Sequence, residues 1–143
     1  MRAPCSIVIL LLATLFTTPA VADIAIIAHP ANPQSSLSEK EVQKIFLGRL
    51  RMFPDSNTET VTLDLPEEST LYSEFYEQIA KMNAAKVKRY RAYYLFSGKG
   101  RIPEQVDNQQ AVIKKVMENP AAIGYVDTSE DLSQVKILLL LHH

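Results

Sequence analysis

The sequence of 143 residues predicts an α/β fold, with a mixed central sheet of about four or five strands flanked by helices. Short β-branched or alternating runs occur between segments whose apolar residues recur at helical spacing. Prolines, glycines and asparagines separate these runs, and the sequence contains no internal repeat or low-complexity tract. Strands and helices that alternate along a chain are typical of the α/β class.

The first 22 residues have the features of a cleavable signal peptide. Arg2 supplies a positive charge, Ile7–Phe16 is an apolar run, and Ala20–Ala22 is a small-x-small cleavage site. This apolar run is too short to cross a bilayer, which takes about 20 residues. We expect cleavage between Ala22 and Asp23 and a periplasmic location. An uncleaved membrane anchor and lipidation of Cys5 are the alternatives.

Cleavage at that site would leave residues 23–143 as the working domain. It removes Cys5, the only cysteine, so we expect no disulfide, no thiol nucleophile and no cysteine metal ligand. Roughly 120 residues suffice for one domain with its own core. The domain has 14 Lys and Arg against 16 Asp and Glu, and this balance gives no argument for a nucleic-acid partner.

The domain is expected to begin with a strand at Asp23–Ala28, a β-branched run followed by two prolines that lack a backbone donor. Ser38 and Glu41 then have the spacing of a capping box, which starts a helix. One face of this helix is apolar, with Val42, Ile45 and Phe46. Gly48 is expected to end it.

Alternation in Thr60–Leu65 predicts a second strand, and Pro66–Thr70 leads into a second helix. The apolar residues of that helix recur at helical spacing: Leu71, Tyr72, Phe75, Tyr76 and Ile79. Asn83 is expected to cap a third helix over residues 84–96. The stretch Ser97–Arg101 is expected to end it.

The last third of the domain is expected to hold one more helix and two strands. After Pro103 we expect a polar link, followed by a helix over Gln109–Glu118 that an Asn-Pro pair ends. The two strands are predicted at Ala121–Val126 and Val135–Leu140.

Three segments, taken in their order along the chain, carry a resemblance. They are HPANPQSSLSEKEVQKIFLGR (His29–Arg49), VTLDLPEESTLYSEFYE (Val61–Glu77) and VMENPAAIGYVD (Val116–Asp127). Together they resemble the substrate-binding proteins of phosphate ABC transporters, and the resemblance runs from Ile24 to Leu139.

That family resemblance implies a periplasmic-binding-protein type II fold, a two-lobed clamshell that holds its anion between the lobes. The matching segments belong to the second lobe, and the length of this chain corresponds to one lobe. We therefore expect one such lobe. Its implied ligand is phosphate or another small oxyanion, bound without covalent chemistry, and its implied partner is a membrane transporter or a sensor protein.

The anion loop of the family resembles Arg-x-x-Gly-Ser-Gly-Thr before a helix, and the equivalent stretch here is Leu65–Leu71. Only Ser69 matches, and a shifted alignment adds Thr70 as a second hydroxyl. These two residues are the candidate ligand-binding residues. Backbone N–H groups at a helix N-terminus attract oxyanions in general, and hydroxyl groups donate to them.

The same loop argues against tight anion binding. Leu65 stands at the arginine position, and a charge-assisted hydrogen bond contributes about 1.5–3 kcal/mol. Glu67 and Glu68 add carboxylates that repel an anion. Ser69 also suits the plain role of a helix N-cap. Two functions thus remain open: an oxyanion-binding module, or a ligand-free interaction or sensing module with the same fold.

Positive charge concentrates in the middle of the chain, at Lys81, Lys86, Lys88, Arg89, Arg91, Lys99 and Arg101. We expect a solvated helix face whose tyrosines pack inward. A surface for an acidic partner, a lipid headgroup or an oxyanion is the alternative. His29 is expected to be a loop residue, and His142 and His143 a frayed pair. Because no catalytic or metal-spaced motif occurs, we expect neither an enzyme nor a metal or other cofactor.

Overall fold

The computed structural model describes Phe16 and residues 22–143, so the rest of the predicted signal peptide lies outside the described residues. The order of elements is β1 (Ile24–Ala28), α1 (Glu39–Phe46), β2 (Val61–Asp64), α2 (Thr70–Ala80), α3 (Ala84–Phe96), β3 (Glu104–Gln105), α4 (Gln109–Glu118), β4 (Ala122–Asp127) and β5 (Lys136–Leu141). None of the helices in this described part is long and apolar enough to cross a membrane.

The strands form one mixed sheet in the order β3-β2-β4-β1-β5. β1 is antiparallel to both of its neighbours, β4 and β5, whereas β2 is parallel to β3 and β4. The predicted mixed sheet is therefore confirmed. One strand was not predicted: the polar link contains the two-residue β3, whose pairing with Leu63 and Asp64 depends on tertiary structure and leaves no pattern in the sequence.

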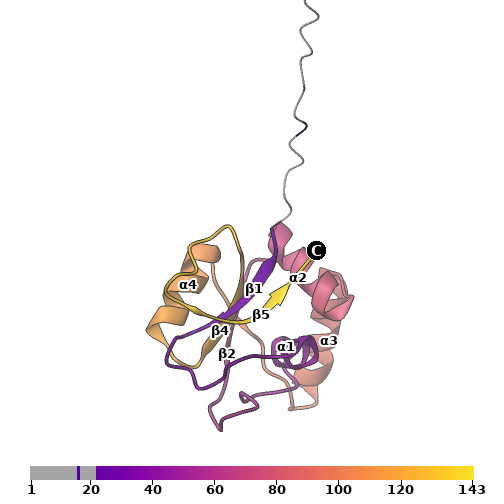
Figure 1. Cartoon of the computed structure of the whole chain (residues 1–143). Helices are drawn as coiled ribbons and strands as arrows, with labels where there is room; N and C mark the ends of the chain where they lie inside the picture. Colours follow the sequence, from indigo (N-terminus) through magenta and orange to yellow (C-terminus); the bar gives the residue numbers. More distant parts are fainter. Residues whose placement is uncertain (1–15, 17–21) are drawn as a thin grey trace, which may run out of the picture.

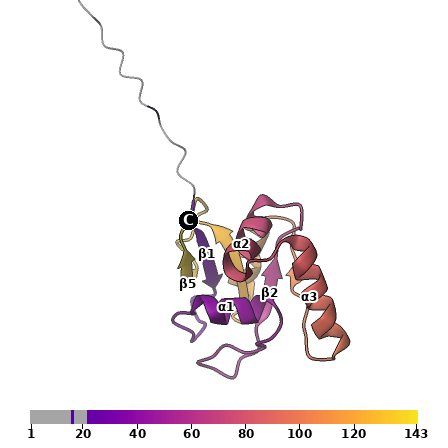
Figure 2. The ribbon, with the colours of Figure 1, turned by 90° about the vertical axis from the view of Figure 1, so that its right-hand side faces the viewer.

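Helices cover both faces of the sheet. Figure 1 shows α4 on one side, and α1, α2 and α3 on the other. Figure 2 shows α3 as the outermost helix, reaching beyond the rest of its layer. α4 packs closely on β4, because a Cβ at Gly124 would lie 2.4 Å from Cγ1 of Val112. Glycine is therefore required there by packing and not by backbone conformation.

The helix ends agree with the predicted caps. Ser38 and Glu41 form the capping box of α1, and Gly48 follows that helix with φ of 80°. Ser69 is the N-cap of α2, and Asn83 is the N-cap of α3. α3 and α4 have the predicted bounds, while the strands at residues 121–126 and 135–140 are each shifted by one residue.

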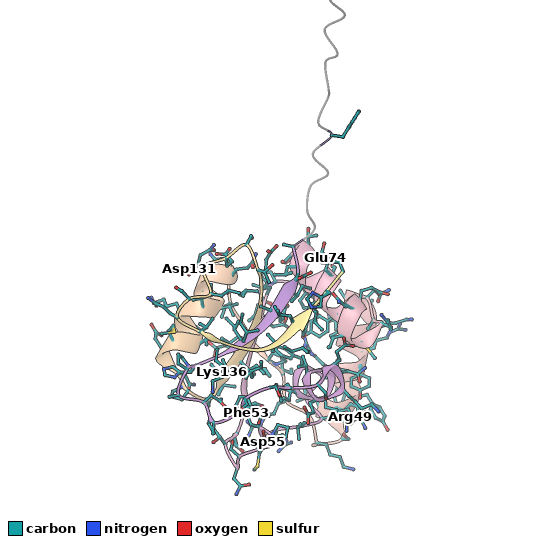
Figure 3. All side chains as sticks on the ribbon, viewed as in Figure 1. Arg49, Phe53, Asp55, Glu74, Asp131 and Lys136 are labelled. Atoms are coloured by element: carbon teal, nitrogen blue, oxygen red, sulfur yellow. The ribbon has the colours of Figure 1, made fainter. Side chains whose placement is uncertain are left out.

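The loop after β1 is held by buried polar groups. The Asn32 side chain donates to the Pro120 carbonyl (2.8 Å), and Nε2 of Gln34 donates to Oδ2 of Asp55 (3.0 Å). Nζ of Lys136 donates to the carbonyl oxygens of Asn32 (2.5 Å) and Gln34 (3.2 Å). Figure 3 shows Lys136 and Asp55 in the lower half of the molecule. These bonds tie the loop to β5 and to the loop before β2.

Candidate functional site

Two helices begin at the edge of the sheet where β2 and β4 end. Because these two strands are parallel, their carboxyl ends, at Asp64 and Asp127, lie at one edge. α2 begins after Ser69 and α4 after Asn108. Helix N-termini carry partial positive charge and N–H donors, and ligands of open α/β sheets bind outside the carboxyl ends of strands. This edge is therefore the place to look for a binding site.

A cleft of about 390 Å³ lies at this edge. Its lining is predominantly polar and consists of Leu65, Pro66, Glu68, Ser69, Asp107, Asn108, Gln109, Gln110 and Glu130. Three of these side chains are carboxylic acids, and none is Lys or Arg. One carboxylate has a partner, since Nε2 of Gln110 donates to Oε1 of Glu130 over 2.9 Å. The cleft therefore concentrates negative charge.

The structure brings Ser69 into the cleft and leaves Thr70 outside its lining. Ser69 is half-buried, and its Oγ accepts from the backbone N–H of Tyr72 over 3.5 Å, which is a weak N-cap bond. Thr70 is the exposed first residue of α2. Of the two loop carboxylates, Glu68 lines the cleft and Glu67 does not. Anion binding by Ser69 and Thr70 stays a prediction.

A buried polar cluster at the end of β2 was not predicted from the sequence. Asp64 is 4% exposed. Its Oδ1 accepts from the Tyr125 hydroxyl (2.5 Å), and its Oδ2 accepts from the Tyr76 hydroxyl (2.9 Å) and from Nη2 of Arg91 (3.0 Å). Nη2 of Arg91 also contacts the Tyr76 hydroxyl and donates to the Phe46 carbonyl (3.2 Å). The cluster thus joins β2, β4, α1, α2 and α3.

The cluster changes the acid–base properties of its members. Burial and the charge of Asp64 raise the pKa of Tyr76 and of Tyr125 well above the usual range. Burial lowers the pKa of Arg91, but Tyr76 and Asp64 more than offset this, so that the pKa of Arg91 is raised overall. The guanidinium and the two neutral hydroxyls together neutralise and solvate the buried carboxylate. One sequence signal existed, since Asp64 interrupts an otherwise apolar strand end.

Asp64 lies beside the cleft but does not line it, whereas its neighbour Leu65 does. The backbone N–H of Leu65 donates to the Tyr125 hydroxyl over 3.3 Å and to Oδ1 of Asp64 over 3.1 Å. The cluster therefore fixes the position of the loop that carries Glu68 and Ser69. Its contribution to a site is to hold that loop.

The cationic segment differs in part from its prediction. Arg91 points inward, and the rings of Tyr90 and Tyr94 contact each other at a tilt of 39°, with their centroids 4.8 Å apart. Tyr93, however, is 72% exposed, so the prediction that the tyrosines pack inward is wrong for this residue. The reason is geometric: the side of α3 that faces the core carries the buried Val87, and Tyr93 does not lie on that side of the helix.

The loop after α3 ends the helix as predicted. Gly98 has φ of 71°, and the N–H groups of Lys99 and Gly100 both donate to the Tyr94 carbonyl, each over 3.1 Å. These two N–H groups are thus hydrogen-bonded within the chain.

The histidines of the described part belong to no group of three or more side chains that could hold a metal ion. Nδ1 of His29 accepts from the N–H of Ala31 over 2.9 Å, which suits a loop residue. His142 is less frayed than expected, since its Nδ1 lies 2.8 Å from Oδ2 of Asp23.

Comparison with known proteins places this fold. No protein-family model matches the chain, and no curated protein matches it by search. A phosphate ABC transporter substrate-binding protein with bound phosphate from Clostridium perfringens is 20% identical, with a TM-score of 0.66 over 82% of this chain and 45% of that protein. An ABC-type phosphate transport receptor from Vibrio cholerae is 14% identical, with a TM-score of 0.67 over 82% of this chain and 45% of that protein. PstS from Borrelia burgdorferi is 16% identical, with a TM-score of 0.64 over 82% and 46%.

These matches define the class of fold. The solved structures that the chain resembles are phosphate ABC transporter substrate-binding proteins, and the chain spans less than half of their length. The protein therefore has the fold of one lobe of a periplasmic binding protein, as the three sequence segments predict. At these identities the likeness establishes the fold alone.

Proposed function

We propose that this protein is an exported interaction or sensing module built on one lobe of the phosphate-type substrate-binding fold. In this proposal residues 1–22 are a signal peptide, residues 23–143 form one periplasmic domain, and the domain works by non-covalent binding and not as an enzyme. One observation carries the proposal: the cleft beside Ser69 is lined by Glu68, Asp107 and Glu130 and by no Lys or Arg.

Simple electrostatics explains why this lining disfavours phosphate. Two like unit charges 4 Å apart repel by about 4 kcal/mol at an effective dielectric constant of 20. The N-terminus of a helix presents only about half a positive charge, so the dipoles of α2 and α4 do not offset three carboxylates. The residues of the cleft thus support a partner that is not a free oxyanion.

The comparisons support the kind of partner. Two of the similar structures are described as an ABC transporter substrate-binding protein and a phosphate transport receptor. By analogy, the partner that we propose is a membrane transporter component or a sensor protein. Its contact surface on this chain includes the rim of the cleft.

Titration calorimetry of the exported protein with inorganic phosphate and with sulfate tests the exclusion of anions. We expect no binding heat and no thermal shift at millimolar anion. The double variant Glu68→Gln/Asp107→Asn should gain measurable phosphate binding, because it removes two repelling charges. Its matched control is Glu74→Gln/Glu77→Gln, which removes two charges from exposed residues of α2 that do not line this cleft. Micromolar phosphate binding by the unaltered protein would overturn the proposal.

A second experiment tests the partner directly. A photo-cross-linking residue at Gln110, on the cleft, is irradiated in intact cells and the product is identified by mass spectrometry. We expect a transporter component or a sensor protein. The same residue at Lys114, exposed and outside the lining, serves as the control. Equal products from both positions would count against an interface at the cleft.

Oxyanion binding is the second candidate function. It is favoured by the position of Ser69, which lies in the cleft at the N-terminus of α2. If this function holds, Ser69→Ala should weaken phosphate binding several-fold, whereas Thr70→Ala should have a smaller effect because Thr70 is outside the lining. Calorimetry on both variants distinguishes the two functions.

A further inference from the structure

Charge is segregated along this chain. Lys81–Arg101 contains seven cationic residues and no acidic residue, while the remainder contains 8 Lys and Arg against 16 Asp and Glu. The segment therefore has a formal charge of +7 within a chain whose net charge is −1. Helix propensity does not require this arrangement, because glutamate suits a helix as well as lysine does.

Apolar side chains are exposed in the same segment. Phe96 is 90% exposed, Tyr93 is 72% exposed, and Ile102, just past the segment, is 61% exposed. Leu95 is also exposed. These residues lie at the C-terminal end of α3 and in the loop after it. We call Tyr93, Leu95, Phe96, Lys99 and Ile102 the α3 tip.

Contacts with the body hold the tip in place with these side chains outward. Val87 of α3 is buried and Tyr90 packs against the core, while Arg91 is bound to Asp64. Nη2 of Arg51 donates to the Lys99 carbonyl over 2.9 Å, and Nη2 of Arg101 lies 3.0 Å from Oε1 of Glu59. The exposure of the tip is thus built into the fold.

The tip lies at the end of the molecule opposite the cleft. Arg51, which holds Lys99, also accepts a hydrogen bond at its carbonyl from the N–H of Thr60, the residue before β2. The cleft begins at Leu65, after the other end of that strand. Figure 3 shows Arg49, two residues before Arg51, at the lower right, and Asp131, the residue after Glu130 of the cleft, at the upper left. A partner or surface that binds the α3 tip therefore leaves the cleft accessible.

The chemistry of the tip fits an anionic bilayer. Aromatic and aliphatic side chains enter the boundary between headgroups and acyl chains, and Lys and Arg around them pair with anionic headgroups. Among the described residues, no ion pair involves Lys88, Arg89 or Lys99, so these cations are available. α3 projects from the body (Figure 2), and a projecting end suits a flat, deformable surface.

From this charge complementarity we propose that the α3 tip docks the protein on the surface of a membrane that contains anionic lipid. The acidic remainder of the chain is repelled by the same surface, which turns the cleft away from it. This inference goes beyond the proposed function and does not depend on what the cleft binds.

Co-sedimentation of the exported protein with lipid vesicles tests the inference. We expect binding to vesicles of phosphatidylglycerol mixed with phosphatidylcholine, weakened by salt, and little binding to phosphatidylcholine alone. The variant Lys88→Gln/Arg89→Gln/Lys99→Gln should lose roughly 100-fold in partition, since each basic residue near an anionic surface contributes about a factor of five. Phe96→Ser should also weaken binding.

The control is Lys40→Gln/Lys44→Gln/Lys114→Gln, which removes the same charge from exposed positions on α1 and α4. It should bind vesicles about as well as the unaltered protein, and all variants should melt at similar temperatures. Because every variant carries the same N-terminus, the comparison holds whether or not the signal peptide is removed. Equal loss in both triple variants, or equal binding to both kinds of vesicle, overturns the inference. A salt-sensitive dimer without vesicle binding, abolished by Lys88→Gln/Arg89→Gln/Lys99→Gln, would instead assign the tip to contact with a second copy.

Discussion

α2 and α3 are consecutive helices of similar length, but most apolar side chains of α2 are buried and those at the end of α3 are exposed. Each begins with a polar N-cap, Ser69 for α2 and Asn83 for α3. α2 buries six side chains, including Phe75 and Tyr76, whereas α3 buries Val87 and directs Arg91 inward. The stacking of Phe75 on Tyr125, with ring centroids 3.9 Å apart, makes α2 part of the core.

This difference shows which apolar residues of each helix are accounted for by burial in the core. Every large apolar residue of α2 packs against the core, so packing accounts for its sequence. At the end of α3, Tyr93 and Phe96 are exposed, and burial does not account for them. An exposed patch of this kind calls for a partner. The two helices meet at Asp64 of β2, whose Oδ2 accepts from the Tyr76 hydroxyl of α2 and from Nη2 of Arg91 of α3. Removing this carboxylate is the most direct test of the comparison.

Asp64→Ala should have the largest effect on stability. It leaves the Arg91 guanidinium buried without its carboxylate and removes the acceptor of Tyr76 and Tyr125. Removing one partner of a buried ion pair typically costs about 3–5 kcal/mol. Urea unfolding followed by circular dichroism measures this loss.

The matched control for that experiment is Glu59→Ala, which breaks the exposed pair with Arg101 and should cost less than about 1 kcal/mol. The double variant Asp64→Leu/Arg91→Met should recover part of the stability, because it removes both buried charges. Similar losses for Asp64→Ala and Glu59→Ala would mean that the buried cluster does not hold α3.

Alkaline pH should lower the stability of the fold through the buried hydroxyls of Tyr76 and Tyr125. The pKa values of Tyr76 and Tyr125 are raised in the folded state, while a free tyrosine titrates near 10. Below about pH 10 both hydroxyls are neutral in both states, so their contribution is fully present there. Above this pH the unfolded chain releases protons that the folded chain retains, and stability falls by about 1.4 kcal/mol per pH unit for each tyrosine.

Urea midpoints between about pH 9 and pH 11 measure this slope. Tyr76→Phe should reduce the loss of stability by about 1.4 kcal/mol per pH unit, which is the contribution of one tyrosine. This holds even though the variant is less stable at neutral pH. Phe96→Ser, at an exposed position on α3 that carries no titrating group, should leave the slope unchanged. An unaltered slope in Tyr76→Phe would contradict the role assigned to burial.

Removal of the N-caps should give the smallest effects on stability, and these effects should differ between the two helices. Ser69→Ala should lower global stability by about 1 kcal/mol, because α2 unfolds only with the core. Asn83→Ala removes the acceptor of the Lys86 N–H and should chiefly speed hydrogen exchange at the start of α3, with a smaller global loss. Equal global losses would show that α3 is as firmly integrated as α2.

Local patterns in the sequence predicted much of this fold. The capping box of Ser38 and Glu41, the N-cap Asn83 and the bounds of α3 and α4 follow from residues that are near each other in the chain. Such signals can be read locally because caps and helical periodicity act over a few residues. The three segments that resemble the substrate-binding proteins predicted the fold of one lobe, and the structural matches confirm this prediction.

The candidate site was predicted only in part. Ser69 was placed at a helix N-terminus beside the expected site, and Glu68 was recognised as a nearby acid. The other acids of the cleft, Asp107 and Glu130, come from distant parts of the chain, and no pattern pointed to them. Their joint charge exists only when α2 and α4 begin at the same edge of the sheet.

The sequence by itself determined the caps, the helices, the main strands and the excess of positive charge from Lys81 to Arg101. These depend on propensity, spacing and composition, which are properties of neighbouring residues. Only the tertiary structure decided that Asp64, Arg91 and two tyrosines share one buried cluster, that the cleft is acidic, and that Tyr93 faces solvent. The reason is that burial and charge proximity depend on which elements pack together, and β2, α2, α3 and β4 meet only in the folded chain.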